Sequence, residues 1–133
     1  MKHILVAYDG SESADRAFEQ ALDLAGKYGA ELHVLTVARP PDFGEEVETE
    51  AVVENSRRHA HHIQKPLKDK APNAHLAVSV GHPTVKITAY AESHGIDLIV
   101  MGHRGKTLFE RWLIGSVAKK VISYAPCSVY VVR

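Results

Sequence analysis

Five short apolar runs, separated by longer segments with helical periodicity, limit the folds that this chain can adopt. The runs occupy residues 4–7, 32–37, 76–80, 98–101 and 129–132. Each run is nearly continuous in Val, Ile and Leu, which is typical of strands covered on both faces. Because strands that alternate with helices are joined by right-handed crossovers, they favour a parallel sheet. We therefore predict an α/β fold, a single doubly wound domain with a five-stranded parallel sheet and helices on both faces.

The segments between the runs carry the spacing of amphipathic helices, with apolar residues at i, i+3, i+4 and i+7. This spacing occurs in residues 14–25, 87–94 and 114–125, and as a thin stripe within the polar stretch 45–70. The hydroxyl of Ser11 or Ser13 is suited to cap the first helix, and Gly29 is suited to end it. The length of 133 residues and the lack of internal repeats predict one domain over residues 1–133.

Charge and cysteine content exclude several classes of protein. The 16 Lys and Arg residues balance 16 Asp and Glu residues, which argues against a nucleic-acid binder that works by bulk charge. A single cysteine excludes a disulfide framework and suits a reducing compartment. No apolar stretch approaches the roughly 20 residues that span a membrane, and the first run meets Asp9 before a signal-peptide core could form. We expect a cytoplasmic protein with neither nucleic acid nor membrane as a partner.

The loop after the fourth run contains the residues best suited to bind a ligand at the carboxyl edge of the sheet. Gly102, Gly105 and Gly115 permit positive φ and a close approach of the backbone to a ligand. Gly115 precedes the predicted helix start at Ser116, where free N–H groups and the helix dipole favour an anion. Arg104 adds a positive charge to the same loop. Together these residues predict a phosphate site.

Two other phosphate-binding motifs do not fit the chain. A Walker A loop has four residues between its first glycine and Gly-Lys-Ser/Thr, whereas only two residues separate Gly102 from Gly105. The dinucleotide fingerprint G-x-G-x-x-G is expected after the first strand, where this chain has Asp-Gly-Ser-Glu-Ser. Neither a P-loop nor a dinucleotide-binding fold is therefore indicated.

The spacing that the loop does follow is G-x2-G-x9-G-S, at Gly102, Gly105, Gly115 and Ser116. With this motif the chain resembles the universal stress protein family, specifically its ATP-binding branch. The resemblance extends over essentially the whole chain. Its other marks are the segments 4–11, 81–83, 97–102 and 129–133.

The resemblance implies a sheet in the order 3-2-1-4-5, with ATP across the ends of strands one and four and Mg²⁺ or Mn²⁺ carried by its phosphates. Asp9 would hold the ribose hydroxyls, and the main chain of Val37 would recognise the adenine edge. The nucleotide-binding residues that it implies are Ala7, Tyr8, Asp9, Val37, Met101, Gly102, His103, Arg104, Gly105, Gly115, Ser116 and Val117. The resemblance also implies a homodimer through the last strand, Val129 to Arg133.

These expectations favour an ATP-binding regulatory protein of the stress response, in which the nucleotide orders the 102–116 loop and changes the binding of an unidentified protein partner. One alternative is a slow ATPase or a phosphoryl or nucleotidyl transferase on the same site. The loop lacks a plausible general base. His103 is the only candidate, and its position between two glycines does not show where its ring points, so we assign no catalytic residue. Another alternative is a dimeric scaffold that binds no nucleotide.

Three further features keep two interpretations each. The cluster Arg57 to His62 is a solvated helix face or a metal site, and the lack of neighbouring acidic or Cys ligands favours the former. Cys127 is a small buried apolar residue or a reactive thiol, and we favour the former. Leu108, Phe109, Trp112 and Leu113 belong either to the core or to an apolar surface that a partner covers.

Overall fold

The computed structural model describes residues 1–39, 50–104 and 115–133. Its centre is a parallel sheet in the order β3-β2-β1-β4-β5, which confirms the predicted topology. The strands are β1 (His3–Ala7), β2 (Glu31–Ala38), β3 (His75–Val80), β4 (Leu98–Gly102) and β5 (Ser128–Val132). Strand β1 therefore lies at the middle of the sheet, and β5 lies at one edge.

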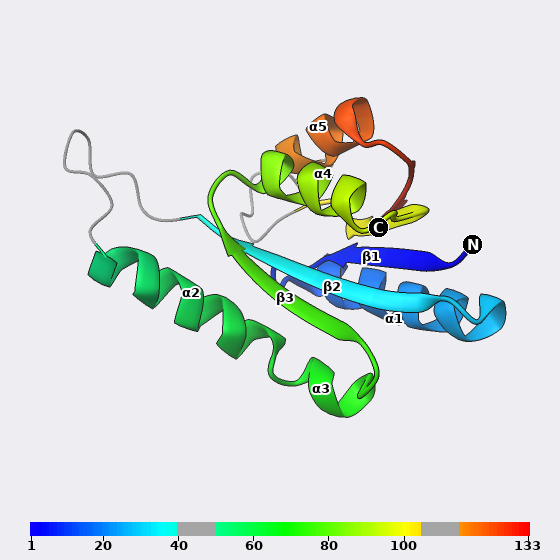
Figure 1. Cartoon of the computed structure of the whole chain (residues 1–133), viewed down its shortest axis with the longest axis horizontal. Helices are drawn as coiled ribbons and strands as arrows, with labels where there is room; N and C mark the ends of the chain where they lie inside the picture. The colour runs from blue at the N-terminus through cyan, green and yellow to red at the C-terminus, as the bar shows by residue number, and fades with distance from the viewer. Residues whose placement is uncertain (40–49, 105–114) are drawn as a thin grey trace.

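Helices cover both faces of the sheet, as predicted (Figure 1). They are α1 (Glu12–Tyr28), α2 (Glu50–Gln64), α3 (Leu67–Lys70), α4 (Pro83–Ser93) and α5 (Ser116–Tyr124). Helices α1, α2 and α3 lie on one face, and α4 and α5 lie on the other. Successive side chains of the central strand β1 point to opposite faces of the sheet. Ile4 packs with Phe18 of α1, whereas Leu5 packs with Ile87 of α4.

The local signals for α1 act as the sequence predicts. Ser11 is the N-cap, and its hydroxyl accepts a hydrogen bond of 3.2 Å from the Ala14 N–H. Gly29 ends the helix in the left-handed region, with φ 63°, where a side chain would be strained. Ser13, the alternative cap, is buried and donates a hydrogen bond of 2.7 Å to the carbonyl of Arg104 instead.

The stretch 45–70 does not form one helix. Helix α2 ends at Gln64, and Pro66 precedes the separate short helix α3, because proline cannot supply the N–H that a continuing helix needs. The buried Gln64 amide donates to the Ala77 carbonyl at 2.7 Å and to the Thr36 hydroxyl at 3.0 Å, which ties the end of α2 to two strands. The N-terminal part of the stretch, residues 45–49, lies outside the described residues.

Within residues 1–39, 50–104 and 115–133, no helix combines the length and the apolar character needed to cross a bilayer.

Candidate functional site

A cavity of about 250 Å³ lies where β1 and β4 end. The chain proceeds from β1 to β2 and β3 on one side, and later adds β4 and β5 on the other side. Strand order therefore reverses between β1 and β4, and ligands of open parallel sheets bind at such a point. The cavity is lined by Ala7, Tyr8, Asp9, Ser11, Ala14, Leu35, Val37, Pro83, Ile87, Met101, Gly102, Arg104, Gly115, Ser116, Val117 and Ala118.

Most of the residues that the resemblance implies come together at this cavity, although they lie far apart in the sequence. Of the twelve, those that line it are Ala7, Tyr8, Asp9, Val37, Met101, Gly102, Arg104, Gly115, Ser116 and Val117. His103 does not line it, and Gly105 lies outside the described residues. Sequence reasoning missed Leu35 and Ile87, which the alternation of β2 and the apolar stripe of α4 could have indicated.

One half of the cavity is apolar. Leu35, Ile87 and Met101 are buried in the core between the sheet and the α4–α5 layer, and Val37 packs against them. Such a surface accepts a flat apolar or aromatic group, while the main chain of the strand ends remains available for polar edges. This half is suited to a nucleobase.

The end of β1 supplies the carboxylate of the site. One oxygen of Asp9 accepts a hydrogen bond of 2.9 Å from the Ser11 N–H, which orients the side chain at the cavity wall. A carboxylate can accept several hydrogen bonds, so Asp9 is also able to bind a pair of hydroxyl groups. The adjacent Tyr8 packs with Phe18 in the α1 layer, and its hydroxyl donates to the Asp15 carboxylate. Burial, reinforced by Asp15, raises the pKa of this phenol above its ordinary value.

The other half of the cavity contains the start of α5. Gly115 is the N-cap residue, and among the described residues no side chain caps the helix, so the first N–H groups at Ser116 and Val117 have no such partner there. The positive end of the helix dipole and these N–H groups together favour an anion. Arg104 lines the same cavity and adds a positive charge. This half is suited to phosphate.

The glycines act differently from the prediction. Among the described glycines, positive φ occurs at Gly10, Gly29, Gly81 and Gly95, so Gly102 and Gly115 do not adopt the positive φ that glycine permits. Gly115 has φ −59° and ψ 155°, which any residue can adopt.

Gly102 is required for close packing. A Cβ atom there would lie 2.8 Å from the Ser13 carbonyl carbon and 2.9 Å from the Ala14 nitrogen, and it would also meet the Ser13 hydroxyl. The start of α1 therefore approaches β4 more closely than a side chain would permit.

His103 directly follows β4, and its main chain joins this strand to β5 and to the start of α5. Its N–H donates to the Val132 carbonyl of β5 at 2.8 Å, and its carbonyl accepts from the Gly115 N–H at the start of α5. The side chain is buried, and this burial lowers the pKa of the imidazole. The candidate base of the sequence analysis thus lies beside the cavity without lining it.

The other features singled out from the sequence lie away from this cavity. On α2, His59, His61 and His62 are exposed, and Arg57 and Arg58 lie near Glu54 at ion-pair distance. Cys127 is half-buried against the core, and burial raises the pKa of its thiol. Leu108, Phe109 and Trp112 lie outside the described residues.

Fold and cavity together define a doubly wound α/β protein with a cavity at its topological switch point. The sequence profile of the universal stress protein family matches residues 1–133, and the chain belongs to that family. A universal stress protein of Methanocaldococcus jannaschii is 32% identical over 139 aligned positions, covering 99% of this chain and 82% of that protein.

Solved structures show the same relationship. Universal stress protein UspA from Lactobacillus plantarum has a TM-score of 0.84 and 32% identity, covering 99% of this chain and 97% of its own. A universal stress protein solved in complex with cAMP has a TM-score of 0.67 and 25% identity, covering 99% of this chain and 97% of its own.

Proposed function

We propose that this chain is a nucleotide-binding regulatory protein whose ligand is ATP. The observation that carries the proposal is the composition of the cavity, in which an apolar half, a carboxylate and an uncapped helix start lie side by side. These are the three kinds of surface that a base, a ribose and a phosphate chain require.

The orientation of the nucleotide follows from these surfaces. The adenine lies in the apolar half, beside Leu35 and Val37, and the Asp9 carboxylate accepts the ribose hydroxyls. The phosphates lie against the N–H groups at the start of α5, with Arg104 nearby. A Mg²⁺ or Mn²⁺ ion would be carried by the phosphate oxygens, which are the hard ligands that such ions prefer.

The relative solved in complex with cAMP supports an adenine nucleotide as the class of ligand. It also makes cAMP a second candidate, because its single phosphate needs only one group of helix N–H donors. Arg104 beside the start of α5 favours the longer phosphate chain of ATP. The affinities for ATP and cAMP, measured side by side, distinguish the two.

Regulation would arise if the nucleotide orders the loop 102–116 and thereby changes a surface for a protein partner. Residues 105–114 of this loop lie outside the described residues. Slower amide exchange or proteolysis in this segment on adding ATP is the expected result. Equal rates with and without saturating ATP would contradict it.

A homodimer through β5 belongs to the same proposal. Strand β5 is at the edge of the sheet, and Tyr130 on it is exposed. A second copy that pairs with this edge would satisfy its free backbone groups. Light scattering after size-exclusion chromatography should give twice the chain mass, and a monomer at all concentrations would contradict it.

The first experiment denatures freshly purified protein and identifies any released nucleotide by chromatography and mass spectrometry. Calorimetric titration with ATP and Mg²⁺, and separately with cAMP, follows on nucleotide-free protein. ATP released intact at near one per chain supports a binding protein that retains its ligand. ADP or AMP instead supports the ATPase or transferase, and no release with no binding heat supports the scaffold.

The matched variant for this experiment is Gly115→Val. Its backbone angles permit a β-branched residue, so the fold should be retained while the new side chain occupies the place where the phosphates approach. We expect nucleotide binding to be lost. Gly26→Ala, where an added Cβ meets nothing within 4 Å, is the control and should bind as the parent does. Parental affinity in Gly115→Val would show that the phosphate site is wrongly placed.

A further inference from the structure

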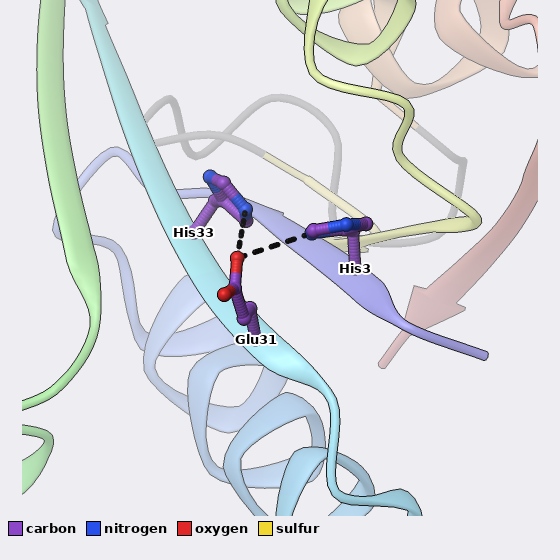
Figure 2. Close-up of side chains that lie close together, drawn as sticks. All are labelled: His3, Glu31 and His33. Carbon is purple, nitrogen blue, oxygen red and sulfur yellow. Dashed lines mark ion pairs between the residues drawn. The ribbon is translucent and has the colours of Figure 1, made fainter.

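A second group of ligand-type side chains lies at the opposite, amino end of the sheet. We call it the amino-end cluster and define it as His3, Glu31 and His33. His3 begins β1 and is the register partner of Glu31, the first residue of β2. His33 comes two residues later on β2, so all three side chains are on the same face. Figure 2 shows the Glu31 carboxylate between the two imidazole rings.

The distances within the amino-end cluster suit a single small ion. The Glu31 Oε2 atom lies 3.3 Å from Nδ1 of His3 and 3.9 Å from Nε2 of His33, and one ligand atom from each residue lies within 4.8 Å of the others. Tetrahedral Zn²⁺ with bonds of about 2.0–2.2 Å separates its ligand atoms by about 3.3–3.6 Å. The Glu31 side chain is 60% exposed, so the amino-end cluster is open to ions from solvent.

His33 has a buried ring nitrogen without a hydrogen bond. The residue is only 5% exposed, and its Nε2 has no hydrogen-bond partner within the part of the chain that the structure describes. The other nitrogen, Nδ1, lies 2.8 Å from the Tyr90 hydroxyl of α4. A metal-binding histidine usually donates its second ring N–H to such a partner, which fixes the tautomer and the orientation of the ring. With Nδ1 protonated, the lone pair on Nε2 faces a carboxylate oxygen, and a cation between them would satisfy both.

Neighbouring side chains hold His3 and His33 in position. His33 is buried, and its ring lies among the rings of His3, His75 and His94. The ring also stacks on His75 with centroids 4.8 Å apart. The main-chain N–H of His3 donates to Asp97 Oδ2 at 2.9 Å, which holds the start of β1. These contacts hold both histidines in a fixed orientation, as a metal site requires of its ligands.

We propose that His3, Glu31 and His33 form a binding site for a divalent transition-metal ion of the Zn²⁺ class. Two imidazoles with one carboxylate favour Zn²⁺ and its neighbours over Mg²⁺ or Ca²⁺, which prefer oxygen ligands throughout. The fourth position is open to water or to His75, whose Nε2 lies 3.7 Å from the same Glu31 oxygen. The bound ion would join the starts of β1 and β2, and it is independent of the nucleotide proposal.

The test uses the full-length, tag-free chain after removal of metals with a chelator. Titration with Co²⁺ should give the visible absorption bands of a four-coordinate site, saturating at one ion per chain and displaced by Zn²⁺. Zn²⁺ at about 100 times its Kd should raise Tm by about 5–10 °C, because the ion binds the folded chain preferentially. No saturable Co²⁺ spectrum and no rise in Tm with Zn²⁺ would overturn the proposal.

Glu31→Gln is the first variant, since it removes one ligand from an exposed position and preserves the size of the side chain. It should bind Zn²⁺ at least about 10-fold more weakly while keeping the metal-free Tm of the parent. The control is the double variant His59→Ala and His62→Ala, which removes an exposed pair of histidines on α2. It should keep parental affinity and the Co²⁺ spectrum. Parental Zn²⁺ affinity in Glu31→Gln, or loss of binding in the α2 variant, would place the ion elsewhere and overturn the proposal.

Discussion

The two ends of one sheet face differ in the ligands that they suit. At the carboxyl end, where β1 and β4 finish, the cavity offers main-chain N–H groups at the start of α5 and an arginine. At the amino end, where β1 and β2 begin, the amino-end cluster offers ring nitrogens and a carboxylate. Helices that follow parallel strands begin at the carboxyl edge and end at the amino edge. Their dipoles therefore favour anions at the first edge and cations at the second.

Helix α4 contacts both ends. Pro83 and Ile87, in its first half, line the cavity, whereas Tyr90, near its end, contacts His33 of the amino-end cluster. The two sites nevertheless use different residues, so a substitution can affect one and spare the other. Single substitutions can therefore test the two sites separately.

The largest effect is expected from Gly102→Ala. The added Cβ would lie 2.8 Å from the main chain at Ser13, and backbone on both sides would have to shift. We expect a loss of about 3 kcal/mol in the free energy of unfolding, measured by urea denaturation. Gly26→Ala is the control, and its open position in α1 should give a gain of about 0.5–1 kcal/mol. Parental stability in Gly102→Ala would contradict the close approach of α1 to β4.

The next two effects should separate the two ends of the face. Asp9→Ala removes the acceptor that we assign to the ribose, so ATP affinity should fall by about 1.5–3 kcal/mol. Zn²⁺ affinity should stay within about twofold of the parent, because Asp9 lies at the other end of the sheet. Isothermal titration of both ligands measures this, and a parallel loss of both affinities would contradict separate sites.

Tyr90→Phe is the reciprocal change at the amino end. It removes the hydroxyl that lies 2.8 Å from Nδ1 of His33 and keeps the ring that stacks on His94. Zn²⁺ affinity should fall about 10- to 100-fold, the usual cost of losing such a supporting hydrogen bond. ATP affinity should not change. An unchanged Zn²⁺ affinity would show that Tyr90 does not orient the metal-binding ring.

The smallest effect is expected from Ser11→Ala. Its hydroxyl caps α1 by accepting the Ala14 N–H, so the loss should be about 1 kcal/mol of stability. Ser123→Ala is the matched control, since that exposed hydroxyl only donates to the Lys119 carbonyl within α5. The control should change stability by less than about 0.5 kcal/mol. Urea denaturation measures the free energy of unfolding of both variants. An equal loss of stability in Ser11→Ala and Ser123→Ala would contradict the capping role of Ser11.

The sequence by itself determined the strands, the sheet order through the family resemblance, and the limits of α1. These features depend on local patterns: continuous apolar runs, helical spacing, a serine cap and a glycine stop act over a few residues. The break at Pro66 was also visible in the sequence, but the thin apolar stripe across it obscured the boundary. Most residues that line the cavity could be named through the family resemblance, and the carboxyl edge where they lie is where open parallel sheets bind ligands.

The tertiary structure alone decided which distant side chains meet. His3 and Glu31 face one another only because the register of β1 against β2 pairs them, and no local pattern specifies that register. The same holds for Gly102, whose lack of a side chain matters because α1 lies against β4, and for His103, whose ring is buried beside the cavity. Local propensity depends on neighbours in the chain, whereas a site depends on neighbours in space, which only the packed sheet and its helices bring together.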